Sequence, residues 1–165
     1  AIDWLTSYSL YSDQVESYFD KHIGADWSAM VLRTKQILQE EADLQEIVRL
    51  VGVDALGFKD RLTLECARSI REDYLHQSAF HEVDTFASPE KQYGMLEMIL
   101  TWYEMGQQAL DADVAFSKIT SMPVMEKIGR MKYAPENVRQ QHFAEVRKQL
   151  DDEFAVLMEG GSDNA

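Results

Sequence analysis

Cysteine, proline and basic residues are all scarce in this chain of 165 residues. The single cysteine, Cys66, excludes an internal disulfide framework and a zinc site built from several cysteines. No run of about eighteen apolar residues occurs, so no segment is predicted to span a bilayer or insert into it. The 16 basic residues stand against 29 acidic ones, and the net charge of −13 disfavours nucleic acid or an anionic membrane surface as a direct partner.

The residues that are present indicate a folded domain. Apolar residues make up 45% of the chain and aromatic residues 10%, which is too rich for a disordered segment. The acidic residues are spread over both halves, as on the solvated face of a helical protein, although an acidic surface for a basic partner remains an alternative. The chain starts at Ala1 without a methionine or a leader pattern, and we expect it to be a piece of a longer protein.

Apolar residues recur with the period of an α-helix, and neither strand alternation nor a tight hairpin turn is evident. Met30, Ile37, Leu44 and Val51 lie seven residues apart on one stripe, and Gly52 after them is typical of a helix C-cap. Further helices are predicted over residues 12–23, 60–77, 88–110 and 135–158, with a short helix between the breaks at Pro123 and Pro135.

These segments predict an all-α fold, a single bundle of about five or six helices with short connections. The bundle covers residues 12–159, after a lead-in at residues 1–11 and before a frayed tail at residues 160–165. Ser88, Pro89 and Glu90 form a favourable helix start, with a capping side chain, a proline and an acidic first turn.

No catalytic or metal-binding equipment is evident in the residues themselves. No glycine precedes a lysine, so a phosphate-binding loop is absent, and only Asp73 and His76 resemble half of a di-iron motif. Cys66 lies among apolar residues of a helix, where a buried, inert thiol is expected. A weak metal patch of His76, His81, Glu82 and Asp84 is an alternative to an ordinary loop.

Two segments carry a sequence pattern that is much more specific than composition or helical spacing. The first is DWLTSYSLY at residues 3–11, and the second is LQEIVRLVG at residues 44–52 with DAL and DRLTLE after it. The pattern continues as IREDYLHQSAFHEVDT at residues 70–85 and SPEKQY at residues 88–93. From residue 2 to about residue 110 the chain resembles the C-terminal helical domain of the catalytic A subunit of prokaryotic V-type, or A/V-type, rotary ATPases.

The resemblance implies a part of an ion-translocating ATP synthase or ATPase. In this family an upstream domain binds ATP or ADP with Mg²⁺, so the fragment alone is expected to hold no cofactor and to be inactive. Three A and three B subunits alternate around a central shaft, and the helical domain is the lever that links site closure to rotation. The implied location is peripheral, on the cytoplasmic face of the cell membrane, as part of a membrane-bound complex.

The resemblance also assigns two sites. Gln77, Ala79 and Phe80 correspond to the pocket for the adenine ring, where the ring of Phe80 would stack on the base. The second site is a shaft-coupling loop, and it contains Asp54, Leu56, Gly57, Phe58, Lys59 and Asp60. Because this loop is only weakly acidic, we expect steric and apolar pushing, with Leu56 and Phe58 exposed at the tip of the bundle.

Two other functions are compatible with the residues. One is a non-enzymatic adaptor that binds a basic helix on its acidic face, and the other is a metal-binding bundle centred on His76, His81 and Asp84. A phosphate loop encoded upstream would favour the ATPase over the adaptor, and stoichiometric metal in the purified chain would favour the metal-binding bundle.

Overall fold

The computed structural model of the chain describes residues 3–10, 12, 24–75 and 88–163. Over these residues every regular element is helical, and the predicted all-α fold is confirmed. The predicted helix over residues 12–23 lies almost entirely outside the described residues, whereas residues 4–10 of the predicted lead-in are helical.

The elements alternate between long helices and short turns. They are α2 (Trp27–Val51), η1 (Val53–Ala55), α3 (Phe58–Ser69), the π-helix η2 (Ile70–Leu75), α5 (Pro89–Asp111), α6 (Phe116–Thr120), α7 (Val124–Gly129), η4 (Met131–Tyr133), η5 (Glu136–Val138) and α8 (Arg139–Asp163). The short helix predicted between Pro123 and Pro135 is α7.

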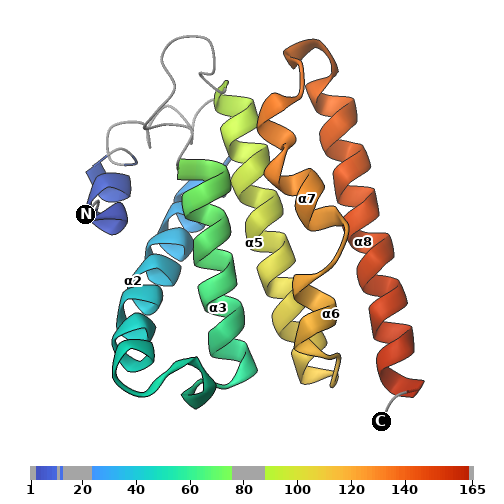
Figure 1. The fold of residues 1–165 in the computed structure, drawn as a ribbon. Coiled ribbons are helices and arrows are strands. Elements are labelled where there is room, and N and C mark those ends of the chain that lie inside the picture. The colour runs from blue at the N-terminus through green and yellow to red at the C-terminus, as the bar shows by residue number, and fades with distance from the viewer. Residues whose placement is uncertain (1–2, 11, 13–23, 76–87, 164–165) are drawn as a thin grey trace.

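The long helices lie roughly side by side, with α5 in the middle of the bundle (Figure 1). Helices α2 and α3 form an antiparallel hairpin against one side of α5, and α8 packs on its other side. The fully buried Leu96, Ile99 and Trp102 of α5 therefore form the centre of the hydrophobic core. Leu62 of α3 and Val146 and Leu150 of α8 are buried in the same cluster.

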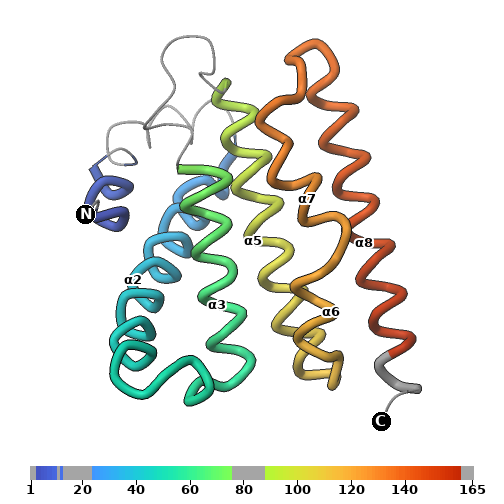
Figure 2. The backbone as a smooth tube through the Cα atoms, in the orientation of Figure 1, coloured from blue at the N-terminus to red at the C-terminus, as the bar shows by residue number. Residues whose placement is uncertain are grey.

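The two ends of the bundle carry different segments. The turn from α2 through η1 to α3 lies at one end, together with the end of α5 and α6 (Figure 2). The end of η2 and the start of α5, which border residues 76–87, lie toward the opposite end. Helix α3 and its extension η2 thus run from one end of the bundle to the other.

The predicted helix caps are confirmed. Gly52 has a φ of 92°, a conformation that favours glycine, and its N–H donates to the carbonyl of Val48. The hydroxyl of Ser88 accepts from the N–H of Lys91 at 3.2 Å, with Pro89 in the first turn of α5. Hydrogen bonds between residues close in the sequence therefore set both helix boundaries.

The last helix differs from the prediction at both ends. The Nζ of Lys91 donates to the carbonyls of Lys132 and Ala134, at 3.1 and 2.7 Å, and so holds the chain in a turn. After this turn comes the 3₁₀ helix η5, and the α-helix begins at Arg139 rather than at Pro135. It continues to Asp163, so it includes residues 160–163 that the sequence assigned to the frayed tail.

Helix α5 also depends on a small residue where α8 crosses it. A Cβ atom on Gly94 would overlap the ring of Phe143, whereas a Cβ on Gly160 would meet nothing within 4 Å. Alanine favours a helix over glycine by about 1 kcal/mol, but overpacking costs about 1–3 kcal/mol. We expect Gly94→Ala to lower the free energy of unfolding by about 1 kcal/mol and Gly160→Ala not to lower it, as measured by urea unfolding. Equal effects of the two variants would contradict the close packing at Gly94.

Candidate functional site, an apolar tip of the bundle

We define the tip as residues 47–60, which contain the end of α2, η1, the following loop and the first turn of α3. Large apolar side chains are exposed along it, with Leu50 at 74% and Val51 at 67% of their full surface. Ile47, Val53 and Phe58 are exposed as well. Because single exposed apolar residues are common but a group of five is not, the tip is a candidate contact surface.

The burial of α2 decreases toward its C-terminal end. Met30 and Ile37 of the predicted stripe are buried, Leu44 is half-buried and Val51 is exposed. The stripe thus begins in the core and ends on the surface. Sequence periodicity indicated the helix correctly, but it could not show how much of α2 the neighbouring helices cover.

The predicted coupling loop lies within the tip, and most of its residues are exposed. Asp54, Gly57, Lys59 and Asp60 are on the surface, as expected, and Phe58 is 56% exposed. The prediction that Leu56 is exposed was wrong, since only 7% of this residue is accessible.

The geometry of the turn explains why Leu56 is buried. The residue has an extended backbone, with φ −90° and ψ 140°, between the 3₁₀ turn and α3. Its carbonyl accepts from the Nε of Arg61 at 3.3 Å, and its N–H donates to the carbonyl of Val53 at 3.0 Å. Leu56 therefore anchors the loop to the bundle and is not a contact residue.

Phe58 is exposed but held in place. Its ring stacks on the ring of Phe116 in α6, with centroids 5.5 Å apart and an interplanar angle of 22°. The guanidinium of Arg61 lies 5.4 Å from the centroid of the same ring. These contacts fix the orientation of Phe58 while leaving more than half of its surface available.

Two charged residues of the tip, Asp54 and Lys59, are paired with residues of opposite sign. Lys59 forms an ion pair with Asp111 at 2.5 Å, and Arg61 lies 3.4 Å from a carboxylate oxygen of Asp54. Both pairs are solvent-exposed and contribute little stability, but they neutralise charge locally. This pairing agrees with an apolar rather than a purely electrostatic contact.

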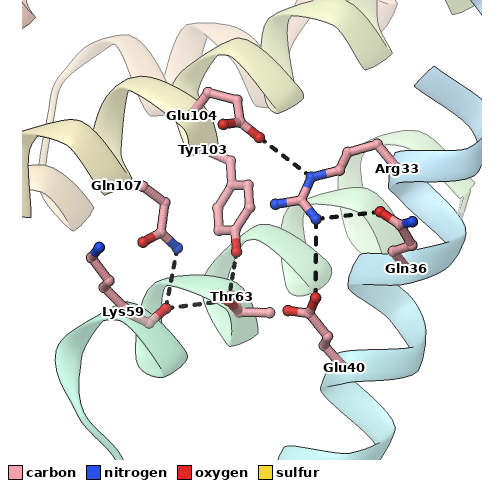
Figure 3. A network of polar contacts seen from close by, with 8 residues as sticks. All are labelled: Arg33, Gln36, Glu40, Lys59, Thr63, Tyr103, Glu104 and Gln107. Carbon is pink, nitrogen blue, oxygen red and sulfur yellow. Dashed lines mark hydrogen bonds and ion pairs between the residues drawn. The ribbon is translucent and has the colours of Figure 1, made fainter. Parts of the chain in front are cut away.

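A polar network braces the tip against the other helices (Figure 3). The Nε of Arg33 in α2 donates to Glu104 of α5 at 3.3 Å, and its guanidinium also approaches Gln36 and Glu40. The backbone carbonyl of Lys59 accepts from the amide of Gln107 at 3.3 Å. The first turn of α3 is thereby tied to α5.

The buried part of this network is a hydrogen bond between two hydroxyl groups. The hydroxyls of Thr63 and Tyr103 lie 2.7 Å apart, and burial raises the pKa of Tyr103. Thr63 also donates to the carbonyl of Lys59 at 3.2 Å, so it would keep a partner without the tyrosine hydroxyl. This hydrogen bond thus joins α3 to α5 within one helical turn of the tip.

We expect Tyr103→Phe to lower the free energy of unfolding by about 0.5–1.5 kcal/mol, the usual contribution of one buried hydrogen bond. Amide hydrogen exchange should become faster in the first turns of α3, because the brace to α5 is weakened. Tyr133→Phe, at a residue that is 67% exposed, is the matched control. Equal loss of stability in both variants would contradict the bracing role.

Comparison with known proteins shows what this architecture is. Residues 16–120 match the family described as the C-terminal domain of V and A type ATP synthase. The chain belongs to this family.

Several curated relatives of this V/A-type ATP synthase domain match over nearly the whole chain. The V-type ATP synthase alpha chain of Thermoanaerobacter pseudethanolicus is 54% identical over 165 residues, which is 100% of this chain and 28% of the relative. That of Acetivibrio thermocellus is 54% identical over 158 residues, 96% of this chain and 27% of the relative. An A-type ATP synthase protein of Methanopyrus kandleri is 48% identical over 162 residues, 98% of this chain and 27% of the relative. The chain therefore spans little more than a quarter of the length of these relatives.

Two other predicted sites of this V/A-type domain involve residues 76–87. Gln77, Ala79 and Phe80 of the predicted adenine site lie outside the described residues, as do His76, His81, Glu82 and Asp84 of the metal alternative. Within the described residues, no group of three or more histidine, cysteine or acidic residues is placed to hold a metal ion. In the same part of the chain, no helix is long and apolar enough to cross a membrane.

The predicted burial of Cys66 is confirmed in this V/A-type domain. Cys66 is fully buried in α3, and its burial raises the pKa of the thiol. A thiol without solvent access and with a raised pKa is a poor nucleophile.

Sequence reasoning missed three contributors to the tip. Leu50 and Val53 carry much of its exposed apolar surface, and Arg61 holds both the Leu56 carbonyl and the Phe58 ring. One signal was available for Leu50, because Leu50 and Val51 are adjacent and cannot both face the core from one helix.

Proposed function

We propose that this chain is the moving helical lever of the catalytic A subunit in a prokaryotic V/A-type rotary ATP synthase or ATPase. It would couple ATP synthesis or hydrolysis to the rotation of a central shaft and so to ion transport across a membrane. The observation that carries this proposal is the apolar tip, which lies toward the opposite end of the bundle from the end of η2 and the start of α5. Between Leu75 and Ser88 lies the segment that resembles the adenine site.

The nucleotide end of the lever would contribute to the site without performing the chemistry. Gln77, Ala79 and Phe80 would line the adenine pocket, with Phe80 stacked on the base. ATP or ADP with Mg²⁺ would be bound mainly by a separate upstream domain, since this chain has no phosphate-binding loop and spans only 28% of a typical relative. We therefore expect the chain alone not to hydrolyse ATP, and phosphate release traceable to it would contradict this.

The other end would push the shaft by direct contact. Leu50, Val51, Val53 and Phe58 supply exposed apolar surface, while Leu56 and the ion pair of Lys59 with Asp111 hold the loop to the bundle. A tip fixed by α3, α5 and α6 can transmit a displacement to the shaft because packed helices resist deformation.

The proposed assembly determines the partners and the location. The chain would sit beside the B subunits of an alternating hexameric ring and touch the central shaft with its tip. The whole complex would be membrane-bound, with this domain peripheral on the cytoplasmic face of the cell membrane.

The nucleotide end is tested by Phe80→Ala in the full-length protein. Stacking of an aromatic residue on a base contributes roughly 1–3 kcal/mol, so we expect nucleotide affinity to fall by about fivefold or more. The free energy of unfolding should change less than the free energy of nucleotide binding. The measurement is nucleotide titration followed by urea unfolding of the same preparation. An unchanged affinity would argue against the adenine role of Phe80.

A further inference from the structure

A second exposed apolar surface lies along α8 and the turns η4 and η5 before it, and it involves no residue of the tip. Tyr133, Val138, Val156 and Met158 are all exposed there. Two hollows, of about 610 and 600 Å³, lie between these elements and share Pro123 and Gln149 in their walls. We call the continuous hollow the α7–α8 groove. Figure 1 shows the two helices side by side at the edge of the bundle.

The dimensions of the α7–α8 groove suit a helix. Its walls extend along α8 and the preceding turn from Val138 to Leu157. At 1.5 Å per residue this is on the order of 30 Å, the length of a helix of about 20 residues. An amphipathic helix placed in such a groove would bury the exposed side chains of Val138 and Val156 with its own apolar face.

The charge around the groove differs from that of the chain as a whole. Although the chain carries −13, the α7 end of the groove is lined by Lys127, Arg130 and His142, with Glu126 as the acidic residue beside them. Among the described residues, neither Lys127 nor Arg130 forms an ion pair. Two cations are thus available to a ligand at this end.

At the other end of the groove Lys118 and Lys148 lie beside the carboxylates of Glu145, Asp152 and Glu153, so the two signs nearly balance. Lys148 pairs with Asp152 at 2.6 Å, and Glu153 accepts from the N–H of Val124 at 3.1 Å and from Gln149 at 2.6 Å. Glu145 accepts from Gln141 at 3.3 Å. Electrostatic attraction of an acidic ligand therefore depends on the α7 end of the groove, where Lys127 and Arg130 lie.

We propose that the α7–α8 groove is a docking site for an acidic amphipathic helix of a partner protein. The apolar face of that helix lies against Tyr133, Val138 and Val156, and its carboxylates pair with Lys127 and Arg130. This surface involves none of the residues of the tip, so the proposal does not depend on shaft coupling and can fail or hold without it.

The first test uses a fluorescent 20-residue helical peptide with leucine on one face and glutamate on the other, titrated against the full chain. We expect saturable binding that weakens at least tenfold in the double variant Lys127→Glu, Arg130→Glu. A peptide with lysine in place of glutamate should bind the double variant better than it binds the original chain. The matched control is Arg49→Glu with Arg68→Glu, which makes the same charge change at exposed residues outside the groove.

Three results would overturn the proposal. The first is no binding of the acidic peptide, and the second is an equal weakening of its binding by the control pair. The third is a lysine peptide that binds the original chain as tightly as, or more tightly than, it binds the double variant. The apolar part is tested by Val138→Asp and Val156→Asp, which should each weaken binding, whereas Leu50→Asp at the tip should not. A photo-crosslinking residue at Val156 in the assembled complex should join an acidic amphipathic segment, and a crosslink to lipid or to a basic segment would contradict the docking site.

Discussion

Replacing Leu50 and Val53 together by aspartate should uncouple the intact rotary complex while leaving this domain folded. Both side chains are exposed, so their removal costs the isolated domain little. In contact with a shaft each would be buried, and burial of such a side chain contributes about 1.5–3 kcal/mol. Two charged replacements would remove this contribution and also place carboxylates against an apolar partner.

The measurement is the number of ions transported for each ATP hydrolysed in reconstituted complexes. We expect this ratio to fall, because the double variant lowers the equilibrium constant of the contact between tip and shaft by at least about tenfold, at 1.4 kcal/mol for each factor of ten. Leu32→Asp is the matched control, since Leu32 is also an exposed leucine of α2 but lies in its first half. An unchanged ratio in the double variant would remove the tip from the coupling mechanism.

The second large effect concerns stability, and it separates the anchor of the tip from its contact surface. Leu56→Asp should lower the free energy of unfolding by at least about 2–3 kcal/mol, because it removes a buried side chain and places a carboxylate in its site. Phe58→Asp should cost clearly less, since Phe58 is 56% exposed and loses mainly its stacking on Phe116. Urea unfolding of the two variants gives the comparison.

The two variants should also differ in their effect on the coupling of ATP hydrolysis to ion transport. A folded Phe58→Asp complex should be impaired in ion transport, whereas Leu56→Asp should first reduce the yield of folded domain. If Leu56→Asp proved as stable as Phe58→Asp, the buried position of Leu56 would be contradicted.

Local signals predicted the helices well because helix boundaries depend on neighbouring residues. Gly52 ends α2 and Ser88 starts α5 through hydrogen bonds made within about four residues, and both were readable from the sequence. The start of α8 was not readable in this way. It depends on Lys91, which lies more than 40 residues away and binds the carbonyls of Lys132 and Ala134.

The candidate site was located by resemblance, but its details required the structure. The sequence placed the loop from Asp54 to Asp60 at the tip, and it also predicted that apolar contact would replace charge. It could not show that Leu56 turns inward, since this depends on Arg61 and on the packing of the loop against the bundle. Nor could it show that Leu50 and Val51 are exposed, because this depends on how the adjacent helices pack against the end of α2.

The α7–α8 groove shows the same limitation more strongly. Lys127 and Arg130 are ordinary helix residues in the sequence, and the overall charge of −13 points toward a basic partner. Only the arrangement of α7 beside α8 brings these cations together with Tyr133 and Val138. The average charge of a chain is thus a poor guide to the charge of one surface.

The central claim is that this domain moves as one body when nucleotide binds elsewhere in the complex. Spin labels at Asp54→Cys and on the central shaft would measure it, since the Asp54 side chain is almost fully exposed and the buried Cys66 does not compete for the label. A second pair of labels within the bundle, at Gln39→Cys and Gln108→Cys, reports whether the domain itself deforms. We expect the distance from tip to shaft to show at least two populations whose ratio changes with nucleotide, while the distance within the bundle stays constant. A single distance from tip to shaft that nucleotide does not change would contradict the lever.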